Sequence, residues 1–197
     1  MMSGETKHRG MLLVLCGPSG VGKSTIARRM AEQHGFNYAI SATTRPRQAE
    51  DDKGKAYEHI SSDEFMRRLD HDQFLEYAQV YDHYYGTPKH PWLDYLAQGR
   101  DLLLEIDVQG ALQIRFQYPD ALLVFILPPD EPTLLQRLKD RGRDAAEEIT
   151  KRFRAARREI HMAKGSRAFD FYVINDTLDR AVEEICKIVR HKRAGGI

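Results

Sequence analysis

The stretch that decides the fold of this chain is MLLVLCGPSGVGKST, residues 11–25. It opens with a nearly continuous apolar run at 11–16, which is typical of a strand covered on both faces. The pattern G-x-x-x-x-G-K-[ST] follows at 17–24 and leads into helical spacing at 23–34. This order brings backbone N–H groups and a helix N-terminus to one point, an arrangement that binds phosphate. The stretch therefore predicts a phosphate-binding loop at the end of a strand.

Two side chains of this loop have predictable roles. Lys23 is placed to reach the β- and γ-phosphates of a nucleoside triphosphate, and the Ser24 hydroxyl can ligate Mg²⁺, the expected cofactor. The residues expected to contact the triphosphate are Gly17, Pro18, Ser19, Gly20, Val21, Gly22, Lys23, Ser24 and Thr25.

Apolar runs alternate with helical patterns along the rest of the chain. The runs are nearly continuous, which favours a parallel sheet, and the helical patterns carry apolar residues three and four apart. Strands are expected at 11–16, 102–106, 122–127 and 171–175, and helices at 23–34, 108–117, 130–140 and 178–192. The sequence thus predicts an α/β fold with a P-loop NTPase core, a parallel β-sheet flanked by helices.

Two segments interrupt this alternation. The first, 41–98, is polar and aromatic, with a helix announced by a capping box at 61–64, a strand at 74–80 and a turn at 84–88. The second, 137–158, carries nine Lys or Arg against four acids. We expect both at the carboxyl ends of the core strands, where open α/β folds bind their ligands.

The composition limits the classes of protein that fit. A length of 197 residues, 42% apolar and 30% charged, suits one globular domain. A net charge of +1 gives no electrostatic case for nucleic-acid binding, and no stretch approaches the roughly 20 apolar residues that cross a bilayer. Cys16 and Cys186 lie far apart in apolar patterns, as in a reducing compartment. We expect a cytoplasmic protein with no nucleic-acid and no membrane partner.

A GTP-binding switch protein is one alternative. Asp107 and Gly110 form a D-x-x-G at the end of a predicted strand, as in GTPases. The N/T-K-x-D segment with which GTPases read guanine does not occur in the sequence. The insertion at 41–98 instead favours an enzyme with a second ligand, that is, a kinase.

The first insertion carries side chains suited to that second ligand. The segment TTRPR, 43–47, presents two guanidinium groups, which can bind a dianionic phosphate in a bidentate manner. Tyr57 and Tyr85 offer hydroxyl donors and rings that can flank a base. Glu76 lies within an otherwise apolar strand, where a carboxylate needs hydrogen-bond donors.

The motifs GPSGVGKST, SATTR, FLEYAQVYDHYYGT, EIDVQG, RLKDRG and VIND follow one another over nearly the whole chain. In these motifs the sequence closely resembles the guanylate kinase family. The resemblance implies reversible, Mg²⁺-dependent phosphoryl transfer from ATP to GMP, giving ADP and GDP, in purine nucleotide metabolism. It assigns the GMP phosphate to Arg45, Arg47, Tyr57 and Tyr85, the guanine to Ser41, Glu76 and Thr87, and the base or Mg²⁺-bound water to Asp107.

Two positions depart from the pattern of that family. Only Pro46 separates Arg45 from Arg47, where the family usually has two residues, and Glu105 replaces the first acid of its D-x-D pattern. The contact of Arg47 with the GMP phosphate therefore depends on the course of an altered loop at 45–57.

The basic segment matches the lid of the same family. Arg137 and Arg141 are one helical turn apart and share a face, and Arg152 follows on a second helix. Together with Lys23 and Arg45 they form the predicted catalytic set, which stabilises charge on the transferring phosphoryl group. No general base is expected, because the phosphate of GMP is itself a nucleophile at neutral pH.

The resemblance divides the chain into three parts. The core P-loop domain comprises 9–40, 99–136 and 159–197, the GMP-binding subdomain 41–98 and the lid 137–158. A related ribose bisphosphate phosphokinase and a non-catalytic scaffold module are the further alternatives, although the chain keeps the lysine and arginine that such modules lack. The sequence leaves protein partners and a homo-oligomer open.

Overall fold

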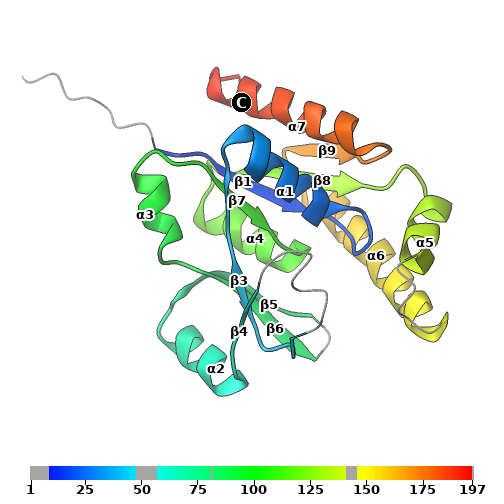
Figure 1. The fold of residues 1–197 in the computed structure, drawn as a ribbon, viewed down its shortest axis with the longest axis horizontal. Helices are drawn as coiled ribbons and strands as arrows, with labels where there is room; N and C mark the ends of the chain where they lie inside the picture. The colour runs from blue at the N-terminus through cyan, green and yellow to red at the C-terminus, as the bar shows by residue number, and fades with distance from the viewer. Residues whose placement is uncertain (1–8, 48–56, 81, 141–145, 197) are drawn as a thin grey trace, which may run out of the picture.

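A five-stranded parallel sheet forms the centre of the molecule (Figure 1). The structure is a computed structural model that describes residues 9–47, 57–80, 82–140 and 146–196. The strand order is β2-β7-β1-β8-β9, so the strand before the phosphate loop lies in the middle. The strands are β1 (Leu12–Cys16), β2 (Asn37–Tyr38), β7 (Leu102–Glu105), β8 (Leu122–Leu127) and β9 (Phe171–Ile174).

Helices cover both faces of this sheet. Along β1, Leu13 and Leu15 belong to one apolar cluster, whereas Val14 and Cys16 belong to the other. Because both faces are buried, the strand is apolar at every position. Helices α1 (Lys23–His34) and α7 (Leu178–Arg193) pack on one face, and α3 (Trp92–Ala97), α4 (Val108–Gln117) and the end of α6 (Ala146–Ser166) pack on the other.

The predicted α/β core is confirmed. The four expected strands and four expected helices are present to within one residue at either end. Asp130 immediately precedes α5 (Glu131–Asp140) and caps its N-terminus, because its carboxylate accepts a hydrogen bond from the N–H of Thr133 at 2.7 Å.

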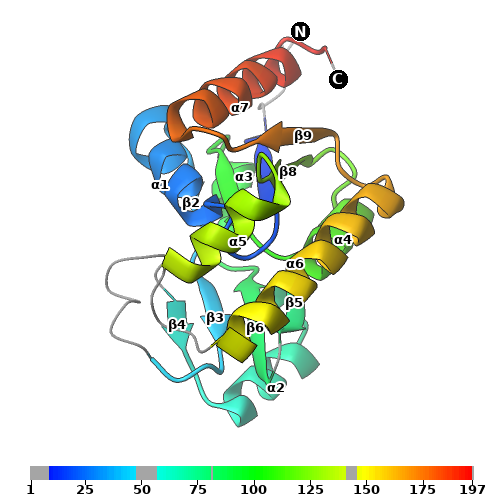
Figure 2. The same ribbon diagram turned by 90° about the vertical axis from the view of Figure 1, so that its right-hand side faces the viewer.

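A second sheet stands below the core (Figure 2). Its order is β4-β3-β6-β5, and helix α2 packs against it through a small cluster of Ala42, Phe65 and Phe74. Half of the expected capping box is present. The Ser61 hydroxyl accepts from the N–H of Glu64 at 3.1 Å, but the Glu64 carboxylate accepts from Arg67 and Arg68 instead of from the Ser61 backbone. The elements of this part are β3 (Ser41–Thr43), β4 (Tyr57–His59), α2 (Ser62–Asp70), β5 (Phe74–Val80) and β6 (His83–Pro88).

The prediction of a turn at 84–88 is wrong. These residues belong to β6, which pairs antiparallel with both β3 and β5 and is therefore an inner strand of its sheet. Gly86 resembles a turn residue for a different reason. A Cβ at this position would lie 2.9 Å from the ring of Phe74, so the glycine allows close packing within a strand.

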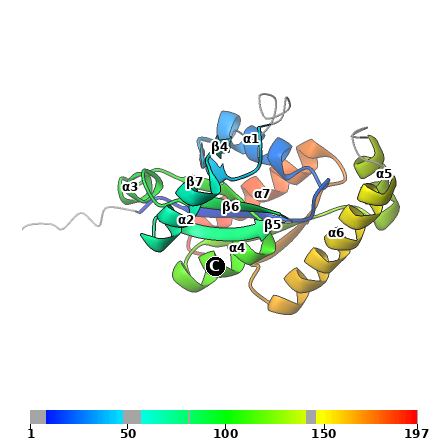
Figure 3. The ribbon, with the colours of Figure 1, turned by 90° about the horizontal axis from the view of Figure 1, so that it is seen from below.

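The two basic helices stand side by side (Figure 3), beyond the carboxyl ends of β1 and β8 (Figure 1). Helices α5 and α6 share a small apolar cluster of Leu134, Leu138 and Ala156. Helix α6 is continuous from 146 to 166, so it connects the basic segment to the core sheet. In the described part of the chain, no helix combines the length and the apolar character that spanning a membrane requires.

Candidate active site

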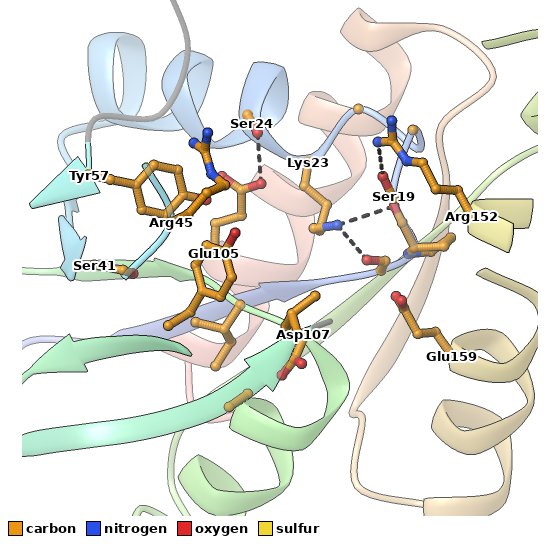
Figure 4. A pocket seen from close by; sticks show the side chains of 18 of the residues that line it. Ser19, Lys23, Ser24, Ser41, Arg45, Tyr57, Glu105, Asp107, Arg152 and Glu159 are labelled. Atoms are coloured by element: carbon orange, nitrogen blue, oxygen red, sulfur yellow. Dashed lines mark hydrogen bonds between the residues drawn. The ribbon is translucent and has the colours of Figure 1, made fainter. Parts of the chain in front are cut away.

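A cavity of about 380 Å³ lies between the phosphate loop and the second sheet (Figure 4). The core sheet contributes the ends of β1 and β7, and helix α6 closes one side. The lining residues are Gly17, Pro18, Ser19, Gly20, Gly22, Lys23, Ser24, Ser41, Arg45, Tyr57, Glu76, Ala78, Val80, Tyr85, Glu105, Ile106, Asp107, Arg152 and Glu159. The two predicted binding regions therefore face each other across one space.

The phosphate loop has a backbone that only glycine supports. Gly17 has a φ of +148°, and a Cβ there would lie 2.5 Å from the carbonyl oxygen of Ile126. Gly22 precedes α1 at a φ of +100°, and no side chain caps the first turn of this helix. The N–H groups of that turn are thus available to an anionic ligand. Of the predicted triphosphate contacts, Val21 is buried below the loop and Thr25 lies outside the cavity lining.

Two cations of the predicted catalytic set touch the loop. The Lys23 ammonium donates to the carbonyl oxygen of Pro18 at 3.2 Å and also to that of Gly17. The Arg152 guanidinium donates to the Ser19 hydroxyl at 2.6 Å. Both cations therefore lie where phosphate oxygens of a bound nucleotide would replace their present partners.

A third predicted cation lies behind the loop. The Arg137 guanidinium donates to the carbonyl oxygen of Asn175 at 2.9 Å, and Arg137 is not among the lining residues. Asn175 in turn donates through Nδ2 to the carbonyl oxygen of Val21 at 2.8 Å. Both side chains thus support the back of the phosphate loop. Arg141 lies outside the described residues.

Ser24 is oriented by an acidic side chain from the neighbouring strand. Its hydroxyl donates to Glu105 at 2.7 Å, and the Tyr38 hydroxyl donates to the other oxygen of the same carboxylate. The Ser24 oxygen therefore keeps its lone pairs for a cation. A hydroxyl with nearby carboxylates suits Mg²⁺, which binds proteins through few oxygens and completes its shell with phosphate and water. Among the described residues, no group of three or more His, Cys, Asp or Glu side chains could hold a metal ion.

The three predicted guanine-reading residues form a buried group on the second sheet. The Glu76 side chain, only 4% exposed, accepts from the Thr87 hydroxyl at 2.6 Å, and the Ser41 hydroxyl lies 3.2 Å from that of Thr87. Glu76 and Ser41 line the cavity, and Thr87 lies behind them. Gly110 makes room for this group, since a Cβ on it would lie 2.2 Å from the Glu76 carboxylate.

Three of the four residues predicted to bind the acceptor phosphate lie together at the cavity. Arg45, Tyr57 and Tyr85 line the cavity, and the two tyrosine rings meet edge to face at 5.8 Å between centroids. The backbone of Arg45 is fixed, because its carbonyl oxygen lies 2.8 Å from Nδ1 of His59. Arg47 is exposed and is not a lining residue, so the structure does not bring it to the others.

Two carboxyl groups stand on the floor of the cavity near Lys23 (Figure 4). Asp107 caps α4 by accepting from the N–H of Gly110 at 2.8 Å, and burial raises its pKa although Gly110 and Lys23 act in the opposite direction. Burial also raises the pKa of Glu159 to about 7. Sequence reasoning missed Glu159. Its spacing of seven residues from Arg152, two helical turns, could have placed it on the same face of α6.

The sequence and the fold of this chain are similar to those of known guanylate kinases. The family model for guanylate kinase matches residues 9–192. The chain is 46% identical over 184 residues to the guanylate kinase of Caldanaerobacter subterraneus subsp. tengcongensis, covering 93% of this chain and 88% of that one. It is 47% identical over 179 residues to that of Gloeobacter violaceus, covering 90% and 86%. The crystal structure of guanylate kinase from Anaplasma phagocytophilum superimposes with a TM-score of 0.77 at 27% identity, covering 94% and 87%. The chain therefore belongs to the guanylate kinase family.

Proposed function

We propose that this chain is a nucleoside-monophosphate kinase that transfers the γ-phosphoryl group of ATP to GMP, reversibly and with Mg²⁺. The observation that carries the proposal is the buried carboxylate of Glu76, which faces the phosphate loop across a single cavity. In the structure this carboxylate accepts from the Thr87 hydroxyl, and a buried carboxylate that borders a cavity is stabilised further by a ligand that brings additional donors.

Guanine supplies those donors and adenine does not. Guanine carries N1–H and an exocyclic N2 amine on one edge, and a carboxylate at Glu76 can accept from both. Adenine presents an acceptor at N1 and no amine beside it, so Glu76 would face a lone pair. Ser41 and Thr87 hold the carboxylate and its surroundings in place. A buried group left unpaired in this way supports discrimination on the order of 10⁴.

The phosphates of the two substrates would meet between the cations of the site. Arg45, Tyr57 and Tyr85, which line the cavity, would hold the GMP phosphate, with Arg47 as a further candidate from the altered loop. Lys23 and Arg152 would bind the triphosphate. Phosphoryl transfer needs alignment and charge neutralisation rather than a general base, and these side chains provide both.

Bound Mg²⁺ would neutralise charge on the phosphates, and Ser24 is the side chain that would hold it. Asp107 is placed either to meet the base or to orient Mg²⁺-bound water. Arg137 and Arg141 complete the proposed charge-stabilising set, Arg137 by leaving its present carbonyl partner.

The three-part division of the chain belongs to the same proposal. The acceptor subdomain at 41–98 and the lid at 137–158 would close over the core at 9–40, 99–136 and 159–197 and exclude water, which otherwise competes as phosphoryl acceptor. The proposed partners are the small molecules ATP and GMP, and the proposed location is the cytoplasm, where both are metabolites.

An acceptor panel tests the proposed function. ATP consumption is measured in a coupled assay with GMP, AMP, UMP or no acceptor, for the wild-type chain and for Glu76→Gln. We expect turnover to depend on GMP alone and kcat/KM for GMP to fall about 10²-fold in the variant, the loss expected for hydrogen bonds to a charged group.

The matched control is Glu183→Gln, on the exposed face of α7, which should leave all rates unchanged. ATP consumption without an acceptor would favour an NTPase, and turnover on none of the three nucleotides would favour the ribose bisphosphate kinases. Equal rates with GMP and AMP would remove Glu76 as the reader of the base.

A further inference from the structure

Glu105 connects the phosphate loop to the edge strand of the core sheet. One oxygen of its carboxylate accepts the Ser24 hydroxyl at 2.7 Å, which Figure 4 marks with a dashed line. The other oxygen accepts the hydroxyl of Tyr38. Both ends of the carboxylate are therefore held, one by α1 and the other by β2.

The sheet register explains how one side chain reaches both partners. Tyr38 ends β2 and is aligned with Leu103 of β7, two residues before Glu105. On the other side of β7, Leu15 of β1 is aligned with Glu105 itself. Glu105 thus stands at the carboxyl edge of the sheet between β2 and the phosphate loop that follows β1.

Tyr38 is a fixed and permanently protonated donor. Its ring packs against the apolar cluster under α1 and α7. Burial, together with the neighbouring Glu105 carboxylate, raises its pKa far above the ordinary value, so the phenol keeps its proton at any physiological pH. Tyr38 is not a lining residue of the cavity, whereas Glu105, to which it is bonded, is one.

We propose that Tyr38 is a positioning residue for the metal–nucleotide site, because it holds Glu105 where that carboxylate accepts a hydrogen bond from the Ser24 hydroxyl. With its hydrogen directed to Glu105, the Ser24 oxygen turns its lone pairs toward the phosphate side. A glutamate has three side-chain torsions, and removal of the phenol takes away the donor that fixes one of its two oxygens, so Ser24 is oriented less strictly. This inference rests on the proposed function, since it takes Mg²⁺-bound ATP as the donor.

The test is binding of ATP alone, without GMP, by isothermal titration calorimetry in Mg²⁺ and in EDTA. We expect Tyr38→Phe to weaken ATP binding in Mg²⁺ about tenfold, as for one hydrogen bond to a charged group, and to change binding in EDTA less than twofold. Adding Tyr38→Phe to Ser24→Ala should cause no further loss, because the effect of Tyr38 passes through Ser24.

Other results overturn the inference. Equal weakening in Mg²⁺ and EDTA would make Tyr38 a structural residue only, and additive losses in the double variant would mean that it does not act through Ser24. The matched control is Tyr172→Phe, which removes a hydroxyl bonded to the carbonyl oxygen of Ala163 at 2.9 Å. It should keep the wild-type ratio of the ATP affinity in Mg²⁺ to that in EDTA.

If thermal unfolding shows that Tyr38→Phe does not fold, a second variant replaces it in the test. Glu105→Gln keeps the phenol and the side-chain length but has one acceptor oxygen in place of two, so it cannot accept from Tyr38 and Ser24 at its two ends, and it should also reduce the Mg²⁺-dependent gain in affinity. An unchanged gain would contradict the inference. The proposed function fails separately, if the wild-type chain binds ATP under neither condition.

Discussion

The two halves of the cavity are built differently. On the acceptor side, Ser41, Glu76 and Thr87 are buried and hydrogen-bonded to one another. On the donor side, Lys23 and Arg152 donate to the phosphate loop, through carbonyl oxygens and the Ser19 hydroxyl. The acceptor side is thus preformed as part of a packed interior, whereas the donor side keeps its cations on contacts that phosphate can replace.

The difference follows from what each half must recognise. A base is read by directional hydrogen bonds, which discriminate only when the reading groups are fixed and desolvated. Phosphate is bound by charge and by backbone N–H groups, and many arrangements of flexible cations satisfy it. Selectivity therefore requires rigidity on one side, and turnover requires exchangeable contacts on the other.

The largest effect is expected on the donor side. Lys23→Met removes the cation nearest to the transferring group, and we expect kcat to fall by about 10³-fold or more, within the range known for charge-stabilising groups in phosphoryl transfer. The affinity for GMP, measured by equilibrium binding, should change less than threefold, because the acceptor side does not depend on Lys23. A parallel loss of GMP affinity would show that the two halves are not separate.

An intermediate effect is expected where the acceptor side is packed most tightly. Gly110→Ala places a Cβ against the Glu76 carboxylate, at 2.2 Å if nothing moves, so Glu76 must shift. We expect KM for GMP to rise at least tenfold, with an overpacking cost of about 1–3 kcal/mol in unfolding free energy. The KM for ATP should be unchanged.

The control for this variant is Gly165→Ala near the end of α6, where a Cβ would have no neighbour within 4 Å. It should keep both KM values and gain up to about 1 kcal/mol of stability from helix propensity. A GMP KM that stays at the wild-type value in Gly110→Ala would mean that Glu76 is not held rigidly.

The smallest effect concerns the pH dependence of stability. Glu159 has a folded pKa of about 7 against an ordinary 4.5, so between these values the folded chain holds a proton that the unfolded chain has released. Stability is therefore lost as pH rises through this window. Glu159→Gln does not titrate, and its Tm should match the wild type near pH 5 and exceed it by about 5 °C near pH 8.

Thermal unfolding followed by circular dichroism at several pH values gives this result directly. Glu184→Gln, on the exposed face of α7, is the control and should show no pH-dependent difference. A Tm difference for Glu159→Gln that is constant from pH 5 to 8 would mean that this carboxyl group does not titrate in the window.

Much of the fold could be predicted from the sequence, and less of the site. The core strands and helices follow from local periodicity, because strands buried on both faces must be apolar throughout. The wrong prediction of a turn at 84–88 has a local cause too. Glycine and proline are typical of turns, and only the pairing of β6 with β3 and β5 shows that this segment is a strand. Residues whose role depends on distant contacts were missed. Tyr38 and Glu105 are 67 positions apart, and Asn175 and Val21 are 154 apart.

The lid shows the same limit for a residue that was predicted. Arg137 and Arg152 both lie in the same basic segment of the sequence. In the structure, however, Arg137 supports the phosphate loop from behind, whereas Arg152 faces the cavity. The packing of α5 decides this, because Leu134 and Leu138 lie against Gly20. Arg137 lies beside them on the helix and therefore reaches the carbonyl oxygens of Val21 and Asn175.

The sequence by itself determined the phosphate loop, the parallel core and the residue types of an acceptor site, because these depend on backbone geometry and on patterns within a few residues. Only the tertiary structure decided which charged groups face the cavity and which oxygen Ser24 is bonded to. Such contacts arise where strands and helices distant in the chain meet at the carboxyl edge of the sheet, and they cannot be predicted from local sequence patterns.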